Sequence, residues 1–177
     1  MINTILAPTD GSDHATLAVN LAADLAEKYG ARLILLNVVD DRELTPSEKH
    51  MAEVEYAERL RARVPGANIE DLPGAGLHGV RPVIIEYAGI SARIRETLAE
   101  GILEQGRKAA KAKGAPDVET RIEFGDAAPA ILNVAKECEA NLIVLGSRGL
   151  SDLRGLMLGS VSHKVANLAN VTVITVK

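Results

Sequence analysis

The stretch that decides the fold runs Asn141-Leu-Ile-Val-Leu145, Gly146-Ser-Arg-Gly149, nine further residues, Gly159-Ser160, and then Val161-Ser-His-Lys-Val165-Ala-Asn-Leu168. Its first part is an apolar run typical of a buried strand, and its last part has the apolar spacing of a helix. The glycines let backbone N–H groups approach a ligand, and a helix start leaves N–H groups unpaired. The pattern favours a phosphate site, and the alternative is a glycine-rich turn that binds nothing.

Four more strands are predicted outside this stretch. Apolar runs at residues 2–7 and 32–39 indicate buried strands, and the alternation at 118–124 indicates a half-exposed or edge strand. Residues 171–176 are predicted to form the last strand. Helical patterns lie between them, including residues 91–113. Strands that alternate with helices predict an α/β fold with a five-stranded, mostly parallel, doubly wound sheet.

The first helix is expected to follow the first strand and its turn. Leu17, Leu21 and Leu25 recur at four-residue spacing with alanines beside them, which predicts one apolar stripe along this helix. Ser12 or Asp13 is expected to cap its start.

Residues 42–90 read as an insertion between the second strand and the second helix. We expect a helix over residues 46–64, an irregular loop over 66–82 and a short strand at Val83–Tyr87. A segment of this length is uncommon in a compact domain unless it has a role. A lid, an oligomer arm, a solvated insertion and a packed structural embellishment all remain open.

The length of 177 residues indicates one domain spanning residues 1–177, and a chain that is 47% hydrophobic can bury a core. The net charge of −4 without a long basic run argues against nucleic acid as a main partner. The single cysteine, Cys138, excludes an internal disulfide and fits a reducing cytoplasm. No apolar run has transmembrane length and no signal peptide is seen, so no membrane association is expected.

Two motifs carry a resemblance to a known family. Residues 146–160 match G-x2-G-x9-G-[S/T] without a gap, and Ile5-Leu-Ala-Pro-Thr-Asp10-Gly-Ser12 has the form of a first strand with an acidic turn. In these motifs the chain resembles the nucleotide-binding branch of the universal stress protein family, over about residues 1–40 and 100–177. The resemblance implies the adenine nucleotide alpha-hydrolase-like fold, with strand order 3-2-1-4-5.

The resemblance also implies a function. It implies a cytoplasmic stress-response protein that binds ATP, with Mg²⁺ or Mn²⁺ carried by the nucleotide, and passes its nucleotide state to an unknown regulatory partner. It further implies a homodimer through antiparallel pairing of the last strand, residues 171–176. That strand has neither proline nor charge, and as a sheet edge it would invite another strand.

In this strand order the chain reverses direction between the first and fourth strands. Ligands of such sheets bind at that point, outside the carboxyl ends of the strands. The loops 8–12 and 146–160 both lie there. We therefore expect the nucleotide to be bound by Pro8, Thr9, Asp10, Ser12, Val38, Val39, Gly146, Ser147, Arg148, Gly149, Gly159, Ser160, Val161 and Ser162.

These residues are expected to have different tasks. Pro8 and Thr9 would line the base pocket, and Val38 or Val39 could offer backbone groups to adenine. Asp10 could accept from a ribose hydroxyl or the base, or hold magnesium through water. The alternative is a turn aspartate that caps the first helix. The residues from Gly146 onward would hold ribose and phosphates.

No catalytic residue and no metal ligand is predicted. The four histidines and Cys138 show no metal-ligand spacing, and neither a G-x-x-x-x-G-K-[S/T] loop nor a G-x-S-x-G elbow occurs. The alternatives left open are a slow ATPase and a nucleotide-free structural or interaction protein of the same fold. The chain lacks the H-x-G-H motif expected of an adenylyl-transferring enzyme. Its turn loops also lack the aromatic residues that a flavin carrier would need.

Overall fold

The computed structural model describes residues 2–40, 83–150 and 159–177, with the backbone alone for residues 83–92. The chain forms two compact units, Met1–Asp40 with Ile102–Lys177, and Asp41–Gly101. The helix predicted over residues 46–64 and the loop predicted over 66–82 lie outside the described residues.

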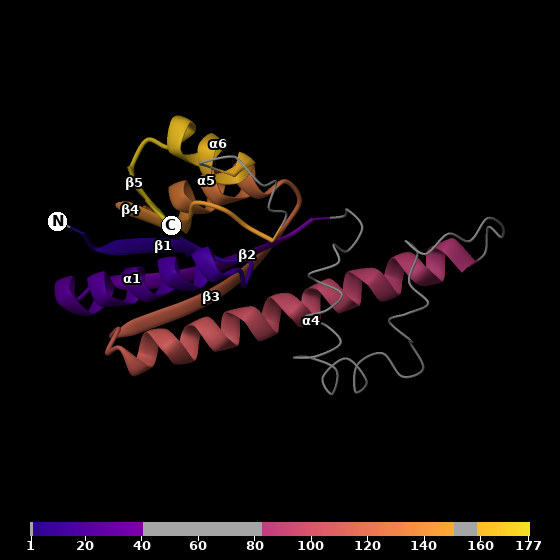
Figure 1. Cartoon of the computed structure of the whole chain (residues 1–177), viewed down its shortest axis with the longest axis horizontal. Helices are drawn as coiled ribbons and strands as arrows, with labels where there is room; N and C mark the ends of the chain where they lie inside the picture. The colour runs from indigo at the N-terminus through magenta and orange to yellow at the C-terminus, as the bar shows by residue number, and fades with distance from the viewer. Residues whose placement is uncertain (1, 41–82, 151–158) are drawn as a thin grey trace. The chain divides into compact units, whose positions relative to one another are not determined.

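The first unit is built on a five-stranded sheet (Figure 1). All four strand pairings are parallel, and the strand order is β3-β2-β1-β4-β5. The predicted α/β fold and the predicted order are therefore confirmed. In chain order the elements are β1 (Thr4–Pro8), α1 (Asp13–Tyr29), β2 (Arg32–Val39), α4 (Val83–Ala112), β3 (Asp117–Phe124), α5 (Ala127–Glu137), β4 (Leu142–Gly146), α6 (Ser160–Leu168) and β5 (Thr172–Val176).

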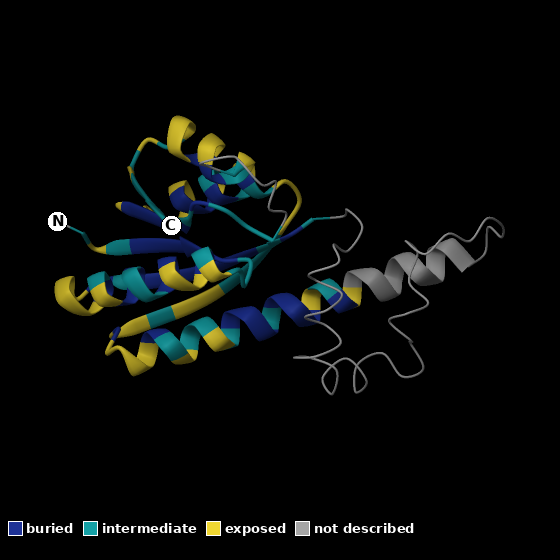
Figure 2. Ribbon diagram, viewed as in Figure 1, coloured by how far each residue is buried: buried dark blue, intermediate teal, exposed yellow. Residues whose placement is uncertain are grey.

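Helices cover both faces of the sheet. On one face, α1 and the last turns of α4 pack on side chains such as Ile5, Leu33 and Val144. On the other face, α5 and α6 pack on side chains such as Leu6 and Ile143. The central strands β1, β2 and β4 are consequently buried, whereas β3 is largely exposed (Figure 2). This burial on both faces is why those strands read as continuous apolar runs.

The apolar stripe of α1 differs from the predicted one. The buried residues are alanines and one valine, at Ala15, Ala18, Val19, Ala22, Ala23 and Ala26. Leu17 is 49% exposed, and Leu21 and Leu25 only flank the core. The predicted stripe is confirmed at its alanines, Ala18 and Ala22, and wrong at Leu17. Small side chains let the helix axis lie close to the sheet. The predicted cap is confirmed, since the Oγ of Ser12 accepts from the N–H of Ala15 at 3.3 Å.

The strand predicted at Val83–Tyr87 was also wrong. These residues form the first turns of α4, which extends to Ala112 and so begins before the helix predicted at 91–113. A short apolar run does not by itself distinguish a strand from a helix segment. Here the run continues without a break into a strong helical pattern, and these residues therefore belong to the helix.

The two edges of the sheet differ in charge. On β3, the guanidinium of Arg121 bonds Glu123 and Glu137, each at 2.6 Å. Hydrogen bonds to Glu123 first, and to Glu137 next, raise the pKa of Arg121. In contrast, β5 contains only threonine, valine and isoleucine. Charged edge strands discourage pairing with other strands. Of the two edge strands, β5 is therefore the one suited to such pairing.

Candidate functional site

The loops that follow β1 and β4 meet at the carboxyl end of the sheet. The backbone N–H of Leu150 donates to Oδ2 of Asp10 at 3.0 Å, and the Oγ of Ser12 lies 3.5 Å from the carbonyl oxygen of Arg148. The structure thus brings together the two stretches that the sequence analysis assigned to one site, although they lie at opposite ends of the chain.

Asp10 links these two loops. Its Oδ1 accepts from the N–H of Ser12 at 3.0 Å, which forms a turn within its own loop, while Oδ2 holds Leu150. Each oxygen of an ionised carboxylate has two lone pairs, so both oxygens can accept a further bond. The cap of α1 is Ser12 and not Asp10.

Thr9 is held between β1 and β2. Its N–H donates to the carbonyl of Leu36, and its carbonyl accepts from Nδ2 of Asn37, both at 2.8 Å. Thr9 and Asn37 are both buried. The sequence analysis did not single out Asn37, although an amide within the apolar run 32–39 was a visible signal. Asn37 fixes the backbone that follows Pro8.

At the end of β2, the backbone groups of Val38 and Val39 face opposite sides of the strand. The carbonyl of Leu36 faces β1, where it accepts from Thr9, and the carbonyl of Val39 faces β3, where it accepts from Gly125 at 2.9 Å. Backbone groups alternate in direction along a strand, so Val38 faces the same side as Leu36. Because β1 ends at Pro8, the N–H and C=O of Val38 face the space beside the Thr9–Ser12 loop.

The first two glycines of the loop lie in close contact with other parts of the protein. A Cβ at Gly146 would stand 2.8 Å from the backbone N of Ala15 and from the backbone C of His14. A Cβ at Gly149 would overlap the carboxylate of Asp10. Gly146 therefore lets α1 approach the end of β4, and Gly149 makes room for Asp10.

Ser147 is 1% exposed and its polar groups are directed inward. Its N–H donates to the carbonyl of Val176 at 2.6 Å, and its Oγ lies 3.2 Å from Nδ1 of His14. The contact with His14 was not predicted, because nothing in the sequence places the first turn of α1 against β4. Ser147 therefore supports the site from within the protein and is not part of its exposed surface.

The last glycine stands at the start of α6. Gly159 is the N-cap residue in extended conformation, and no side chain caps it. A Cβ there would find its nearest neighbour, the carbonyl oxygen of Ser147, at 3.4 Å, which is ordinary contact. Ser160 is exposed and Val161 half-buried. Ser162 is 3% exposed, and its hydroxyl bonds backbone carbonyls of the loop.

Other parts of the described structure offer less. No group of three or more histidine, cysteine or carboxylate side chains suited to a metal ion occurs in residues 2–40, 93–150 and 159–177. Within the same part of the chain, no helix is long and apolar enough to cross a membrane. Burial raises the pKa of the Cys138 thiol, which makes it a poorer nucleophile.

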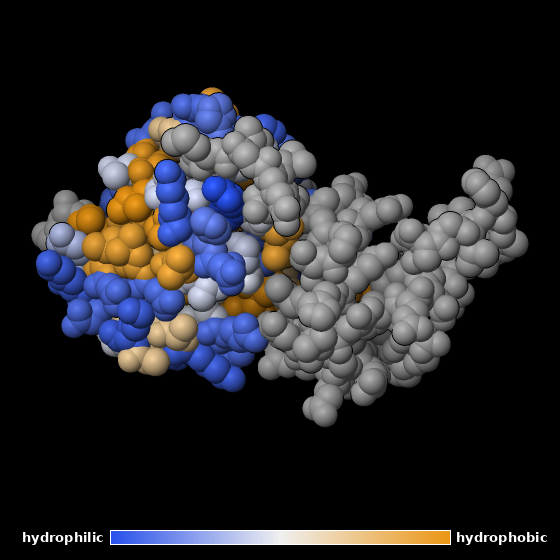
Figure 3. All heavy atoms as spheres, in the orientation of Figure 1, coloured by the Kyte–Doolittle hydropathy of each residue, from blue (hydrophilic) through white to orange (hydrophobic). Residues whose placement is uncertain are grey.

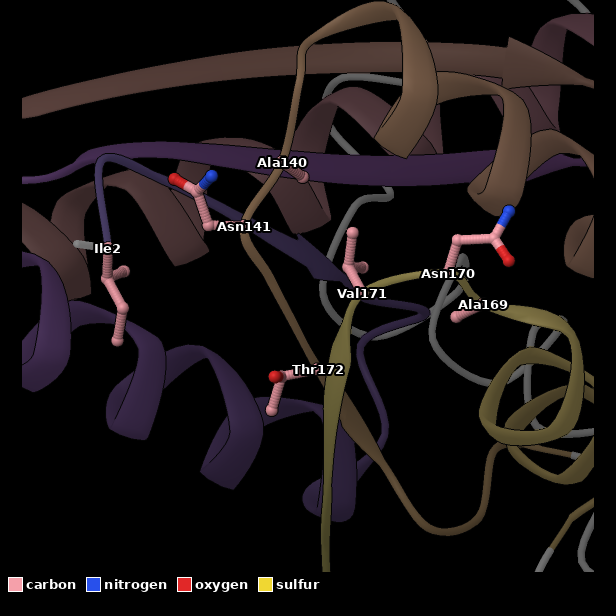
Figure 4. Close-up of a pocket in the computed structure, with 7 residues that line it drawn as sticks. All are labelled: Ile2, Ala140, Asn141, Ala169, Asn170, Val171 and Thr172. Atoms are coloured by element: carbon pink, nitrogen blue, oxygen red, sulfur yellow. The ribbon is translucent and has the colours of Figure 1, made fainter.

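A shallow depression lies at the amino ends of β1, β4 and β5, away from these loops (Figure 4). It is lined by Ile2, Ala140, Asn141, Ala169, Asn170, Val171 and Thr172. The Oδ1 of Asn141 is already occupied by the N–H groups of Asn3 and Thr4, at 2.8 and 3.1 Å. The loops at the carboxyl end thus remain the candidate site.

Comparison with known proteins agrees with this geometry. The chain is 34% identical to the universal stress protein YxiE of Bacillus subtilis (strain 168), over the full length of both. Among solved structures it is similar to universal stress protein UspA from Lactobacillus plantarum, with TM-score 0.68 and 26% identity over 99% of this chain and 98% of that one. It is likewise similar to a universal stress protein solved in complex with cAMP, with TM-score 0.62 and 26% identity over 99% and 97%.

These likenesses extend over the elements that build the candidate site, from β1 to the start of α6. The model of the universal stress protein family matches residues 1–177. With that match, and with a relative at 34% identity over the whole chain, this protein belongs to the universal stress protein family.

Proposed function

We propose that this protein binds an adenine nucleotide, ATP with Mg²⁺ or Mn²⁺, at the carboxyl end of its sheet, and acts as a cytoplasmic regulatory protein through its nucleotide state. The observation that carries the proposal is Gly159, where a Cβ would meet the described residues only at ordinary contact distances, at a helix start that no side chain caps. Gly146 and Gly149 are explained by contacts within the protein, and Gly159 is not. A backbone that approaches a phosphate closely would explain it.

The related structure in complex with cAMP supports an adenine nucleotide as the ligand class. On this proposal, backbone N–H groups at Ser160 to Ser162 hold phosphate, with the exposed hydroxyl of Ser160 and the Arg148 side chain beside them. Pro8 and Thr9 line the base pocket. The carboxylate of Asp10 can accept from a ribose hydroxyl, or from a water of the metal ion, because each of its oxygens retains a lone pair.

The backbone of Val38 favours adenine over guanine. Its carbonyl can accept from the exocyclic N6 amine of adenine, whereas guanine presents the O6 acceptor at that position. Two acceptors that face each other without a donor would leave a buried group unpaired. Calorimetry with MgATP and MgGTP tests the proposal, and we expect ATP to bind more tightly. Absence of heat with ATP at millimolar concentration would overturn it.

We further propose that ATP is held and not turned over rapidly. Hydrolysis requires a group that orients the attacking water near the γ-phosphate. His163 is exposed, and its ring lies 3.1 Å from Nδ2 of Asn167 along the outside of α6. The carboxylate of Asp10 already accepts from Ser12 and Leu150, and on this proposal its remaining lone pairs serve the ribose or the metal ion. Release of phosphate near the median enzyme rate of ~10 s⁻¹ in a malachite-green assay, abolished by Gly159→Val, would instead make the protein an ATPase.

The regulatory proposal includes a homodimer through β5. This strand is a sheet edge without charge, and apolar side chains gather over β5 and toward α1 (Figure 3). The carbonyl of Val176 faces β4, because it accepts from Ser147. By alternation, the N–H of Val173 faces the open edge, where a partner strand would pair with it.

Light scattering tests this interface. Val173→Pro removes a donor from the open edge and leaves the β4–β5 ladder intact, since proline is tolerated on edge strands. We expect a dimer for the parent protein and a folded monomer for the variant. A monomeric parent, or a dimer that persists in the variant, would show that β5 is not the interface.

A further inference from the structure

The carbonyl oxygen of Ser147 accepts two hydrogen bonds from residues at the far end of the glycine loop. The carbonyl oxygen of Ser147, at the start of the loop, accepts from the N–H of Gly159 at 2.7 Å and from the Oγ of Ser162 at 2.8 Å. A carbonyl oxygen has two lone pairs, so this acceptor is fully used. The bonds join the end of β4 to the start of α6 across the intervening loop.

We propose that Ser147 and Ser162 are positioning residues, which hold Gly159 and the amino end of α6 in the geometry that binds phosphate. The inference rests on the proposed nucleotide function. Ser162 is 3% exposed, and the acceptors close to its hydroxyl are the carbonyls of Ser147 and Gly159. A hydroxyl has one proton to donate, so Ser162 donates to the loop and not to the nucleotide.

Ser147 is itself fixed from other sides, which makes it a suitable anchor. Its N–H is bonded to Val176 of β5, and its hydroxyl contacts His14 of α1. It thereby joins the loop to elements on both sides of β4. An anchor fixed in this way limits the arrangements of Gly159 and the first turn of α6, and fewer arrangements reduce the ordering cost when a ligand binds.

Ser160 offers a matched control. It lies two residues before Ser162 in the same turn of α6, but it is exposed. If a serine hydroxyl contacts phosphate directly, Ser160 is the better placed of the two. The variants Ser160→Ala and Ser162→Ala therefore separate direct contact from positioning.

The experiment measures two quantities for each variant: amide hydrogen exchange of Gly159 by NMR without nucleotide, and the affinity for MgATP by calorimetry. For Ser162→Ala we expect Gly159 to exchange roughly three- to tenfold faster, and the affinity to fall by about threefold or more. Ser162→Thr keeps the hydroxyl and should restore both quantities. Ser160→Ala should leave the exchange of Gly159 as in the parent protein.

The outcomes separate this inference from the proposed function. An affinity loss in Ser162→Ala without faster exchange would mean direct contact and would overturn the positioning role. Faster exchange with unchanged affinity would overturn it too, since the loop would then position nothing. No MgATP binding by the parent protein would overturn the proposed function, and with it the positioning role, whatever the exchange data show.

Discussion

The two ends of the glycine loop resemble each other in sequence and differ in structure. At the first end, a Cβ on Gly146 would meet the backbone of α1 at 2.8 Å. At the last end, a Cβ on Gly159 would meet its nearest neighbour at 3.4 Å. The first glycine is required for helix and strand to pack, whereas a Cβ at the last would meet only ordinary contacts, at a helix start that no side chain caps. On the proposed function, the motif therefore combines residues that serve the fold with residues that serve the ligand.

The largest expected effect is a loss of stability when Gly146, at the first end of the loop, is replaced. Gly146→Val should lower the free energy of unfolding by about 3 kcal/mol, because the added side chain meets backbone that cannot rotate away. Urea denaturation followed by circular dichroism measures this change. A loss below about 0.5 kcal/mol, the range of an ordinary surface substitution, would remove the distinction between the two ends.

The next largest effect is a loss of nucleotide affinity when Gly159, at the last end of the loop, is replaced. Gly159→Val should lower the affinity for MgATP by about 1.5–3 kcal/mol, roughly 10- to 150-fold, through loss of a hydrogen bond to a charged group. Its free energy of unfolding should change by no more than about 1 kcal/mol. Calorimetry and urea denaturation measure the two quantities.

Gly159→Ser is the control for that variant. Serine is a preferred N-cap residue, so this change should not weaken α6 although it fills the same space. Unchanged affinity in both variants, with native circular dichroism, would show that the last end of the loop is also structural.

The smallest effect is expected at the middle glycine. Gly149→Ala places a methyl group against the carboxylate of Asp10, a side chain that can rotate. The bond from Leu150 to Asp10 should weaken, with a cost of about 1.5 kcal/mol. Asp10→Asn is the companion variant, because it keeps the shape and removes the charge.

The measurement for both variants is the affinity for MgATP together with the free energy of unfolding. If Gly149→Ala behaves like Gly146→Val in stability, the middle glycine belongs with the first end. If it behaves like Gly159→Val, with loss of binding alone, it belongs with the last.

Much of the fold followed from local sequence. The central strands were predicted because burial on both faces makes a strand continuously apolar, and β3 was predicted from the alternation of its residues. The cap at Ser12 followed from its preference for bonding a helix N–H. Local signals failed at Val83–Tyr87, where a short apolar run is ambiguous, and at Leu17 of α1, which is exposed.

The site divides in the same way. The sequence by itself determined the order of elements and the glycine pattern, because periodicity and turn chemistry act between near neighbours. Only the tertiary structure decided that Gly146 faces α1, that Gly149 faces Asp10, and that Ser147 is a buried anchor. These contacts join residues from opposite ends of the chain. They exist because the parallel order β3-β2-β1-β4-β5 sets β1 beside β4, and no local pattern encodes which side chains then meet.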